Sequence, residues 1–395
     1  MKTDTVSSTA PGTNGTFWAA QSLADGAAGA ALLHIERART GKGTWQEAHT
    51  WVKEATSGEV LGSTDAGLFL GAPALAFVLH TAAAPAERYQ APRRILDRYV
   101  RDIAHQRAAA GLARIGRADA APFHEYDLLY GLTGIGALLL RTQPGSDALE
   151  HVLTYLVALT RPIKLHRRRL PGWWVGHGPH WAGGAFHGEP HANFGAAHGI
   201  TGPLLLLAQA ARQGLTVPGQ TEAIRTVDAW LSRWRQGSPQ GVWWPETITL
   251  SEITTGRPRQ HCAGRPSWCY GTPSIARAGQ LSAIVLGDPE KQRGFEQALA
   301  DCLADPVQLA QVTDPGLCHG WAGLYQCAWR AARDAISPAL TARLPTLAKT
   351  FALHARSEPL SIGFLNGHAG TTLALAVATT AEPPTTGWDA CLLID

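Results

Sequence analysis

Short glycine motifs, each followed by an apolar segment with helical spacing, divide this sequence into seven similar units. The motifs have the form Gly-x-x-small and begin at Gly26, Gly71, Gly131, Gly199, Gly271, Gly320 and Gly367. Their spacings of 45, 60, 68, 72, 49 and 47 residues each leave room for two helices and two connections. Recurrence at such intervals is typical of a repeat protein.

Two kinds of helix are expected within each unit. Segments directly after the motifs, such as 30–35, 135–140 and 204–208, are apolar on most faces and predict buried inner helices. Segments between them, such as 89–107 and 221–236, carry charges on one face and predict outer helices. The pattern favours an all-α fold, an α/α toroid of seven inner and seven outer helices that forms a single domain over residues 1–395.

Two long intervals interrupt this regularity. Residues 162–194 are dense in Gly, His and Trp, and residues 241–264 begin with the β-branched and aromatic composition of a short strand. We expect both to be irregular or β-rich insertions. Because equivalent turns of a closed ring gather at one end and form a common cavity there, we expect these insertions to lie over its mouth. Residues 1–18 are expected to be flexible.

Composition excludes some classes of function. Charged residues make up 16% of the chain and the net charge is +3, too weak a bias to predict nucleic acid as a partner. The longest apolar runs are far shorter than the ~20 residues of a membrane-spanning helix. Because the N-terminal segment lacks a basic start followed by an apolar core, we expect no signal peptide and a cytoplasmic location.

Three candidate metal ligands stand directly before two of the motifs. Cys269 lies two residues before Gly271, and Cys318 and His319 directly precede Gly320. Two thiolates and one imidazole predict a zinc site with one position left open, as in catalytic zinc centres. The alternative is a closed structural site completed by His261, Cys262 or Cys327. Cys302 and Cys391 are expected to be buried small hydrophobic residues.

A histidine occupies the corresponding slot of another unit. His198 precedes Gly199 as His319 precedes Gly320, and the pKa of a free imidazole suits proton transfer near pH 7. Asp127, four residues before Gly131, is placed either to orient that imidazole or to cap the following helix. Arg265 is placed either to stabilise a developing anion or to act as a structural cation.

Two further clusters in the first insertion are open to two interpretations. His177, His180, His187 and His191 lack a clear metal-ligand spacing, so a solvated loop is favoured over a second metal site. The run from Arg161 to Arg169 contains five Lys or Arg residues and predicts a solvated loop, with docking of a leader peptide as the alternative.

Together, the Gly-x-x-Gly units and the segments 193–203, 267–271 and 318–320 resemble the lanthionine synthetase C family, over residues 19 to 376. The resemblance implies a toroidal, zinc-dependent cyclase that adds cysteine thiols to dehydroalanine or dehydrobutyrine and forms (methyl)lanthionine rings. Its site residues would be the zinc ligands Cys269, Cys318 and His319, and the catalytic residues His198, Asp127, Arg265 and Tyr270. The implied partners are a dehydrated precursor peptide with its leader, a dehydratase and a transporter.

The chemistry of the residues agrees with this expectation. A peptide thiol has a pKa of about 8.5, and coordination to Zn²⁺ removes its proton. Addition of the thiolate produces an enolate that a neighbouring acid must protonate. A zinc protein prenyltransferase would require a carboxylate near Cys269, and segment 267–271 has none. Two further hypotheses are a glutathione-adding relative of the family and a non-catalytic peptide-binding scaffold.

Overall fold

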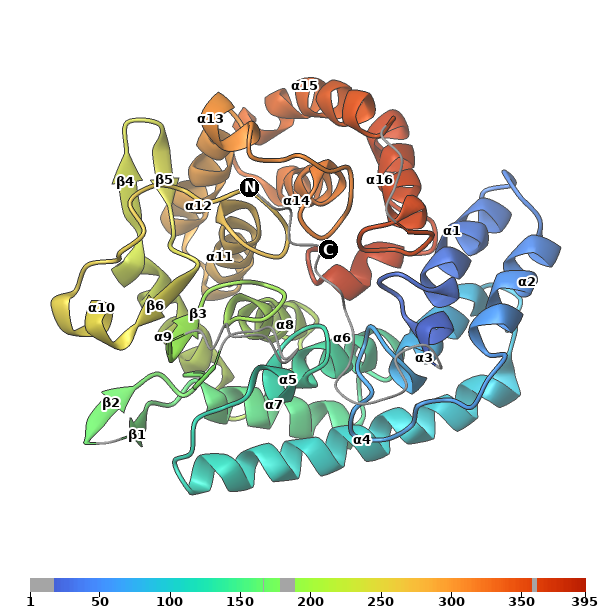
Figure 1. Cartoon of the computed structure of the whole chain (residues 1–395), viewed down its shortest axis with the longest axis horizontal. Helices are drawn as coiled ribbons and strands as arrows, with labels where there is room; N and C mark the ends of the chain where they lie inside the picture. The colour runs from blue at the N-terminus through green and yellow to red at the C-terminus, as the bar shows by residue number, and fades with distance from the viewer. Residues whose placement is uncertain (1–17, 166, 178–188, 357–360) are drawn as a thin grey trace.

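Seven helices follow the seven glycine motifs and surround a common axis (Figure 1). The computed structural model describes residues 18–165, 167–177, 189–356 and 361–395. The inner helices are α1 (Ala27–Arg39), α3 (Ala72–Ala83), α6 (Leu132–Thr142), α8 (Thr201–Arg212), α11 (Thr272–Leu286), α14 (Trp321–Asp334) and α16 (His368–Thr380). Each contacts the next, and α16 contacts α1, so the ring is closed.

An outer layer packs against this ring. Its helices are α2 (Trp45–Ala55), α4 (Gln90–Gly116), α7 (Asp147–Leu159), α9 (Gln220–Trp234), α12 (Pro289–Cys302) and α15 (Ala339–His354). Each packs against the inner helix that precedes it in the sequence. The predicted α/α toroid is confirmed. No helix in the described part of the chain is long and apolar enough to cross a membrane.

The seventh outer helix of the prediction is not found among the described residues. After α16 the chain continues into the short 3-10 helix η2 (Trp388–Leu392), which contacts inner helix α6. The buried carboxylate of Asp389 accepts hydrogen bonds from Gln326 and Arg330 of α14 at 2.6–2.7 Å. Arg277 of α11 donates to the carbonyl oxygen of Ile394 at 2.8 Å. These side chains hold the last segment against the inner helices, so this segment does not pack as an outer helix.

Small two-stranded sheets lie in the two long intervals, as predicted for the described residues there, except that one strand, β4, precedes the second interval. The strands pair as β1 (Ile163–Leu165) with β2 (Arg168–Leu170), β3 (His191–Asn193) with β6 (Thr247–Thr249), and β4 (Gln236–Ser238) with β5 (Gly241–Trp243). The helix α10 (Leu250–Thr255) follows β6 directly. The β3–β6 pair joins one insertion to the other. Two strands, β5 and β6, are found where a single strand was expected after Gly241. The strand is interrupted because the side chain of Trp244 is buried in the core and Pro245 lacks the backbone N–H that a sheet hydrogen bond requires.

Close contact between the fourth residue of the motif and the backbone of the preceding loop explains why this residue is small. A Cβ atom added to Gly323 would lie 1.9 Å from the carbonyl oxygen of Leu317, and one added to Gly370 would lie 1.8 Å from that of Phe364. Both distances are far shorter than any van der Waals contact between a carbon and an oxygen atom. The loop before each of these helices therefore packs directly on the first helical turn, and a side chain at Gly323 would displace the segment that contains Cys318.

The glycine turns are also joined to one another through the main chain. Backbone N–H groups donate to carbonyl oxygens of a neighbouring turn at 2.9–3.3 Å in the pairs Leu23–Phe69, Phe69–Leu129, Leu128–Ala197, Ala196–Cys269, Cys269–Cys318, Cys318–Leu365 and Leu365–Ala24. The last pair returns to the first turn, so the hydrogen bonds form a closed circuit around one end of the toroid. We call it the turn circuit. It holds the residues before each motif glycine at fixed positions relative to one another.

Candidate functional site

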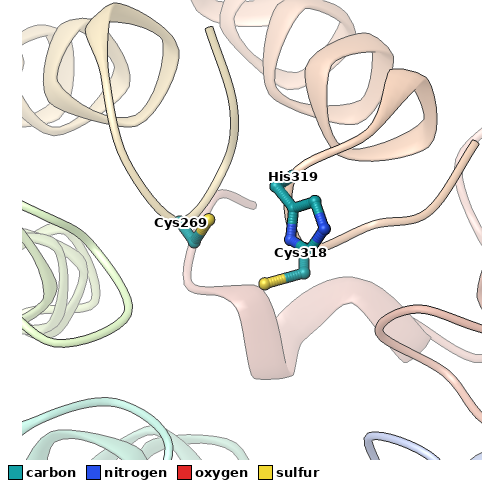
Figure 2. A group of neighbouring side chains, drawn as sticks. All are labelled: Cys269, Cys318 and His319. Carbon is teal, nitrogen blue, oxygen red and sulfur yellow. The ribbon is translucent and has the colours of Figure 1, made fainter. Parts of the chain in front are cut away.

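Two neighbouring turns of the circuit bring three soft or borderline ligands together. The Sγ atoms of Cys269 and Cys318 and a ring nitrogen of His319 all lie within 4.8 Å of one another. Figure 2 shows Cys269 on one loop facing Cys318 and His319 on the next. Cys269 is buried, whereas Cys318 and His319 are partly exposed. The site is therefore a recessed cluster with one accessible side.

The protonation states of these groups are coupled. A hydrogen bond from Cys318 lowers the pKa of the Cys269 thiol well below its usual value, and the same bond raises the pKa of Cys318. The hydrogen bond between Cys269 and His319 raises the pKa of the imidazole. Negative charge thus collects on the Cys269 sulfur. Two sulfurs and one nitrogen at this separation are a donor set that suits Zn²⁺.

The residues considered for a closed site do not complete it. In the described part of the chain, the group that could hold a metal consists of Cys269, Cys318 and His319. Cys262 is exposed, and Cys327 is fully buried on α14, where desolvation raises the pKa of its thiol to about 12. Three protein ligands agree with the prediction of a site with one open position.

Asp314 is a residue of this site that was not predicted from the sequence. One carboxylate oxygen lies 3.5 Å from Nε2 of His319, and the other accepts a hydrogen bond from the N–H of Gly316 at 2.9 Å. A carboxylate behind a ligating histidine fixes the orientation of the ring and raises its basicity. The sequence did contain a signal for Asp314. It stands six residues before its motif glycine, Gly320, just as Asn193 stands six residues before Gly199. Asn193 likewise accepts a hydrogen bond from the N–H of the residue two positions later.

His198 and Asp127 form the second pair of the predicted site. Nδ1 of His198 lies 2.7 Å from one carboxylate oxygen of Asp127, whose side chain is only 1% exposed. The other oxygen accepts from the N–H groups of Tyr130 and Gly131 at 2.8 and 2.7 Å. One oxygen of Asp127 therefore holds the turn before α6, not the first turn of the helix itself, while the other holds the imidazole. The edge of the Phe123 ring packs against His198 as well.

Arg265 and Tyr270 line one pocket together. This pocket of about 420 Å³ is bounded by Glu246, Gly264, Arg265, Ser267, Tyr270 and Gln311. The hydroxyl oxygen of Tyr270 accepts a hydrogen bond from the side chain of Asn193 at 2.9 Å, and burial raises the pKa of Tyr270 above its usual value. Tyr270 therefore keeps its proton at neutral pH and can donate a hydrogen bond to a bound group. The positive φ of Gly271, +91°, turns the chain sharply after Tyr270.

The histidine cluster of the first insertion is only partly described, because His180 and His187 lie outside the described residues. His177 and His191 both contact the ring of Phe123. Among the described residues these histidines form no group with metal-ligand geometry. The described part of the cluster is thus an aromatic wall beside His198.

Comparisons with known proteins address the resemblance. A family profile described as "Lanthionine synthetase C-like protein" matches residues 18–393. The chain belongs to this family. The solved structure of a protein named nisin cyclase has a similar fold, with a TM-score of 0.81 and 19% sequence identity over 95% of this chain and 93% of that chain. No curated protein sequence matches the chain. For this LanC-like protein, the comparisons establish the family and the toroidal fold.

Proposed function

We propose that this LanC-like protein is a zinc-dependent lanthipeptide cyclase. It would add cysteine thiols of a precursor peptide to dehydroalanine or dehydrobutyrine residues and form (methyl)lanthionine rings. The observation that carries the proposal is the cluster of Cys269, Cys318 and His319 within 4.8 Å. The His198–Asp127 pair stands on the same turn circuit. The fold shared with nisin cyclase supports the same activity.

The reaction needs one proton removed and another delivered. A bond forms between the cysteine sulfur and the β-carbon of the unsaturated residue, the electron pair of the C=C bond moves toward the neighbouring carbonyl, and the α-carbon takes a proton. When bound by Cys269, Cys318 and His319, zinc would hold the substrate thiol as a thiolate at neutral pH. The thiol proton passes to solvent or a base, so no oxidant or reductant is required.

His198 is placed to deliver the proton. Its Nδ1–H donates to Asp127, which leaves Nε2 as the nitrogen that can carry the transferred proton. Because the capping bonds of Asp127 fix its carboxylate, the imidazole is held in one orientation. A positioned acid of this kind contributes roughly 10²–10⁴-fold to a rate.

Arg265 and Tyr270 are placed to stabilise the developing enolate. Both line the pocket on the side of Cys269, and each offers a hydrogen-bond donor. Tyr270 remains protonated because burial raises its pKa, and Asn193 fixes its hydroxyl. Donors held in place before the reaction stabilise an oxyanion without reorganisation.

The test is a count of thiols. The protein is produced together with a dehydrated precursor peptide, and the free cysteines that remain are alkylated and counted by mass spectrometry. We expect every cyclised cysteine to resist alkylation, and the Cys269→Ala variant to leave all of them reactive. Addition of free glutathione to the same peptide distinguishes the glutathione-adding hypothesis, which predicts adducts in place of rings. The dehydratase and the transporter are proposed partners that pull-down from the producing cell would test.

A further inference from the structure

The β1–β2 hairpin carries an exposed cluster of positive charge. Arg161, Lys164, Arg167, Arg168 and Arg169 are all exposed, and none of them has an ion pair with a carboxylate in the described part of the chain. The charge run is therefore not balanced by the protein itself. In Figure 1 the hairpin projects from the edge of the molecule, below α10 in this view.

The register of the hairpin separates an inner face from an outer one. Ile163 pairs with Leu170, and both are buried. Lys164 pairs with Arg169 on the opposite face, and both are exposed. Like charges directly opposite one another destabilise an antiparallel pair. An anionic group bound between Lys164 and Arg169 would remove this repulsion.

Arg168 has a different role from its neighbours. Its guanidinium donates to the hydroxyl oxygen of Thr254 in α10 at 3.1 Å, which ties the hairpin to the second insertion. It lies on the inner face with the buried apolar pair, since it pairs with Leu165. The hairpin is thus anchored on one face, and its other face is left to solvent.

The hairpin lies at the same end of the toroid as the candidate site. Helix α6 starts at a glycine turn, and α7 returns the chain to that end, where β1 follows after Thr160. Just beyond β2, the carbonyl oxygen of Trp173 accepts from the hydroxyl of Tyr126, the residue before Asp127. Val175 then exchanges two backbone hydrogen bonds with His191 of β3 at 3.0 Å. The hairpin therefore stands at the outer rim of the end that carries the candidate site, and the segment that follows it runs back toward Asp127.

We propose that the outer face of β1–β2, with Lys164 and Arg169 at its centre and Arg161 and Arg167 beside them, binds an acidic segment of the peptide substrate. The proposal rests on the proposed function, because it identifies a second contact for the same peptide. Both strands also have one edge without a partner strand among the described residues, and an extended segment can pair with such an edge. The cyclised part enters the cavity while the acidic part stays on the hairpin.

An acidic peptide fits this surface better than a membrane or a nucleic acid. This cluster of cations occupies one short hairpin, and the chain as a whole carries only +3. Binding to a polyanionic surface generally draws on a broad basic face. A few carboxylates in an extended segment match a few cations spaced along two strands.

A binding assay with a matched control tests the proposal. The probe is a fluorescently labelled peptide of Asp, Glu, Ser and Gly, compared by anisotropy with a peptide that has Asn and Gln in place of the acids. The hairpin variant changes Lys164→Gln and Arg169→Gln on the outer face and the exposed Arg161→Gln and Arg167→Gln beside them, and keeps Arg168. The control variant removes the same charge from exposed positions of α4 and α15, by Arg94→Gln, Arg98→Gln, Arg343→Gln and Lys349→Gln.

We expect the parent and the control variant to bind the acidic peptide, and the hairpin variant to bind it roughly fourfold or more weakly. Each exposed ion pair contributes a factor of about 1.4 to 5 to affinity, and the factors multiply over four cations. Binding should weaken as ionic strength rises to about 0.15 M, where the Debye length is about 8 Å. Equal affinity of the hairpin and control variants would overturn the proposal. So would tighter binding to phosphatidylglycerol vesicles or a single-stranded oligonucleotide than to the acidic peptide.

Catalysis separates this proposal from the proposed function. Two dehydrated substrates are compared, one joined to the acidic segment and one without it. We expect the hairpin variant to raise KM only for the first and to leave kcat unchanged for both, because it removes no group from the cavity. If the parent cyclises neither substrate, the proposed function fails, while the anisotropy result still decides whether the hairpin binds acidic peptides.

Discussion

The backbone N–H of Cys269 donates a hydrogen bond to the carbonyl oxygen of Cys318, with an N···O distance of 3.0 Å. The two candidate thiolate ligands are thus held by main-chain atoms that do not depend on their side chains. The bond is one member of the turn circuit, and both loops are fixed further by the helices that they precede. The ligands are therefore expected to stand close together before any metal arrives.

Removal of the metal should leave the toroid folded. We expect about one zinc per chain, as the three-ligand set predicts, and chelation should lower the melting temperature while the far-UV circular dichroism of the helices is retained. The drop follows because a ligand bound only to the native state stabilises it by mass action. Cys318→Ala should lose zinc, whereas the control Cys302→Ala, at a buried thiol on α12, should keep it. Loss of the helical signal on chelation would instead indicate a structural metal site.

Asp314 should support metal binding through His319. Asp314→Asn keeps an oxygen to accept from the N–H of Gly316 but loses the carboxylate beside Nε2 of His319. Loss of such an outer partner typically weakens metal affinity by about 10- to 100-fold, and competition with a chromogenic chelator would measure it. Unchanged zinc affinity in a variant of unchanged melting temperature would show that Asp314 serves the loop alone.

Asp127→Asn should separate capping from proton transfer. The amide oxygen can still accept from Tyr130 and Gly131, but the amide nitrogen now donates to Nδ1 of His198 and forces the ring proton onto Nε2. The imidazolium also loses its anionic partner. We expect an unchanged melting temperature and zinc content, with cyclisation slowed by roughly 10²–10⁴-fold, as for loss of an acid or base.

The companion variant Asp127→Ala tests the capping half of this argument. It leaves two backbone N–H groups of the turn without an acceptor, at a cost of about 1–3 kcal/mol for each that stays buried and unsatisfied. Urea unfolding of Asp127→Ala and Asp127→Asn should therefore differ, while both lose activity. Full cyclisation by Asp127→Asn would remove the carboxylate from the mechanism and leave Asp127 as a cap.

The sequence was sufficient for the ring of inner helices because its signal is local. Each motif glycine begins a helix, and the small fourth residue reports a close contact within the same unit, as at Gly323. The three candidate ligands and His198 were singled out for the same reason, since they occupy equivalent slots of the repeat. Burial of Cys302 and Cys391 was also predicted from residue type and is confirmed.

Features that depend on contacts between units could not be predicted in this way. The turn circuit joins residues that are tens of positions apart through backbone atoms, which carry no sequence signal. The path of the last segment depends on Asp389 meeting Gln326 and Arg330 inside the ring, and no local pattern distinguishes it from an outer helix. Asp314 had a local signal, but its meaning required the distance to His319.

Acid should destabilise the protein through His191. Burial lowers the pKa of this histidine, and that of the partly buried His34, from the ordinary value of 6.5. Near and below that value the unfolded chain binds more protons than the folded one, so stability is greatest above about pH 6.5 and falls as the pH drops. His191 is the clearest case, because its side chain is buried and its Nε2 has no hydrogen-bond partner among the described residues. The free energy of unfolding in urea, measured at about pH 7.5 and about pH 5.5, should therefore decrease less for His191→Gln than for the parent.

His49→Gln, at an exposed site on α2, serves as the control and should follow the parent. An equal decrease in all three proteins would show that protonation of His191 does not contribute to the acid sensitivity.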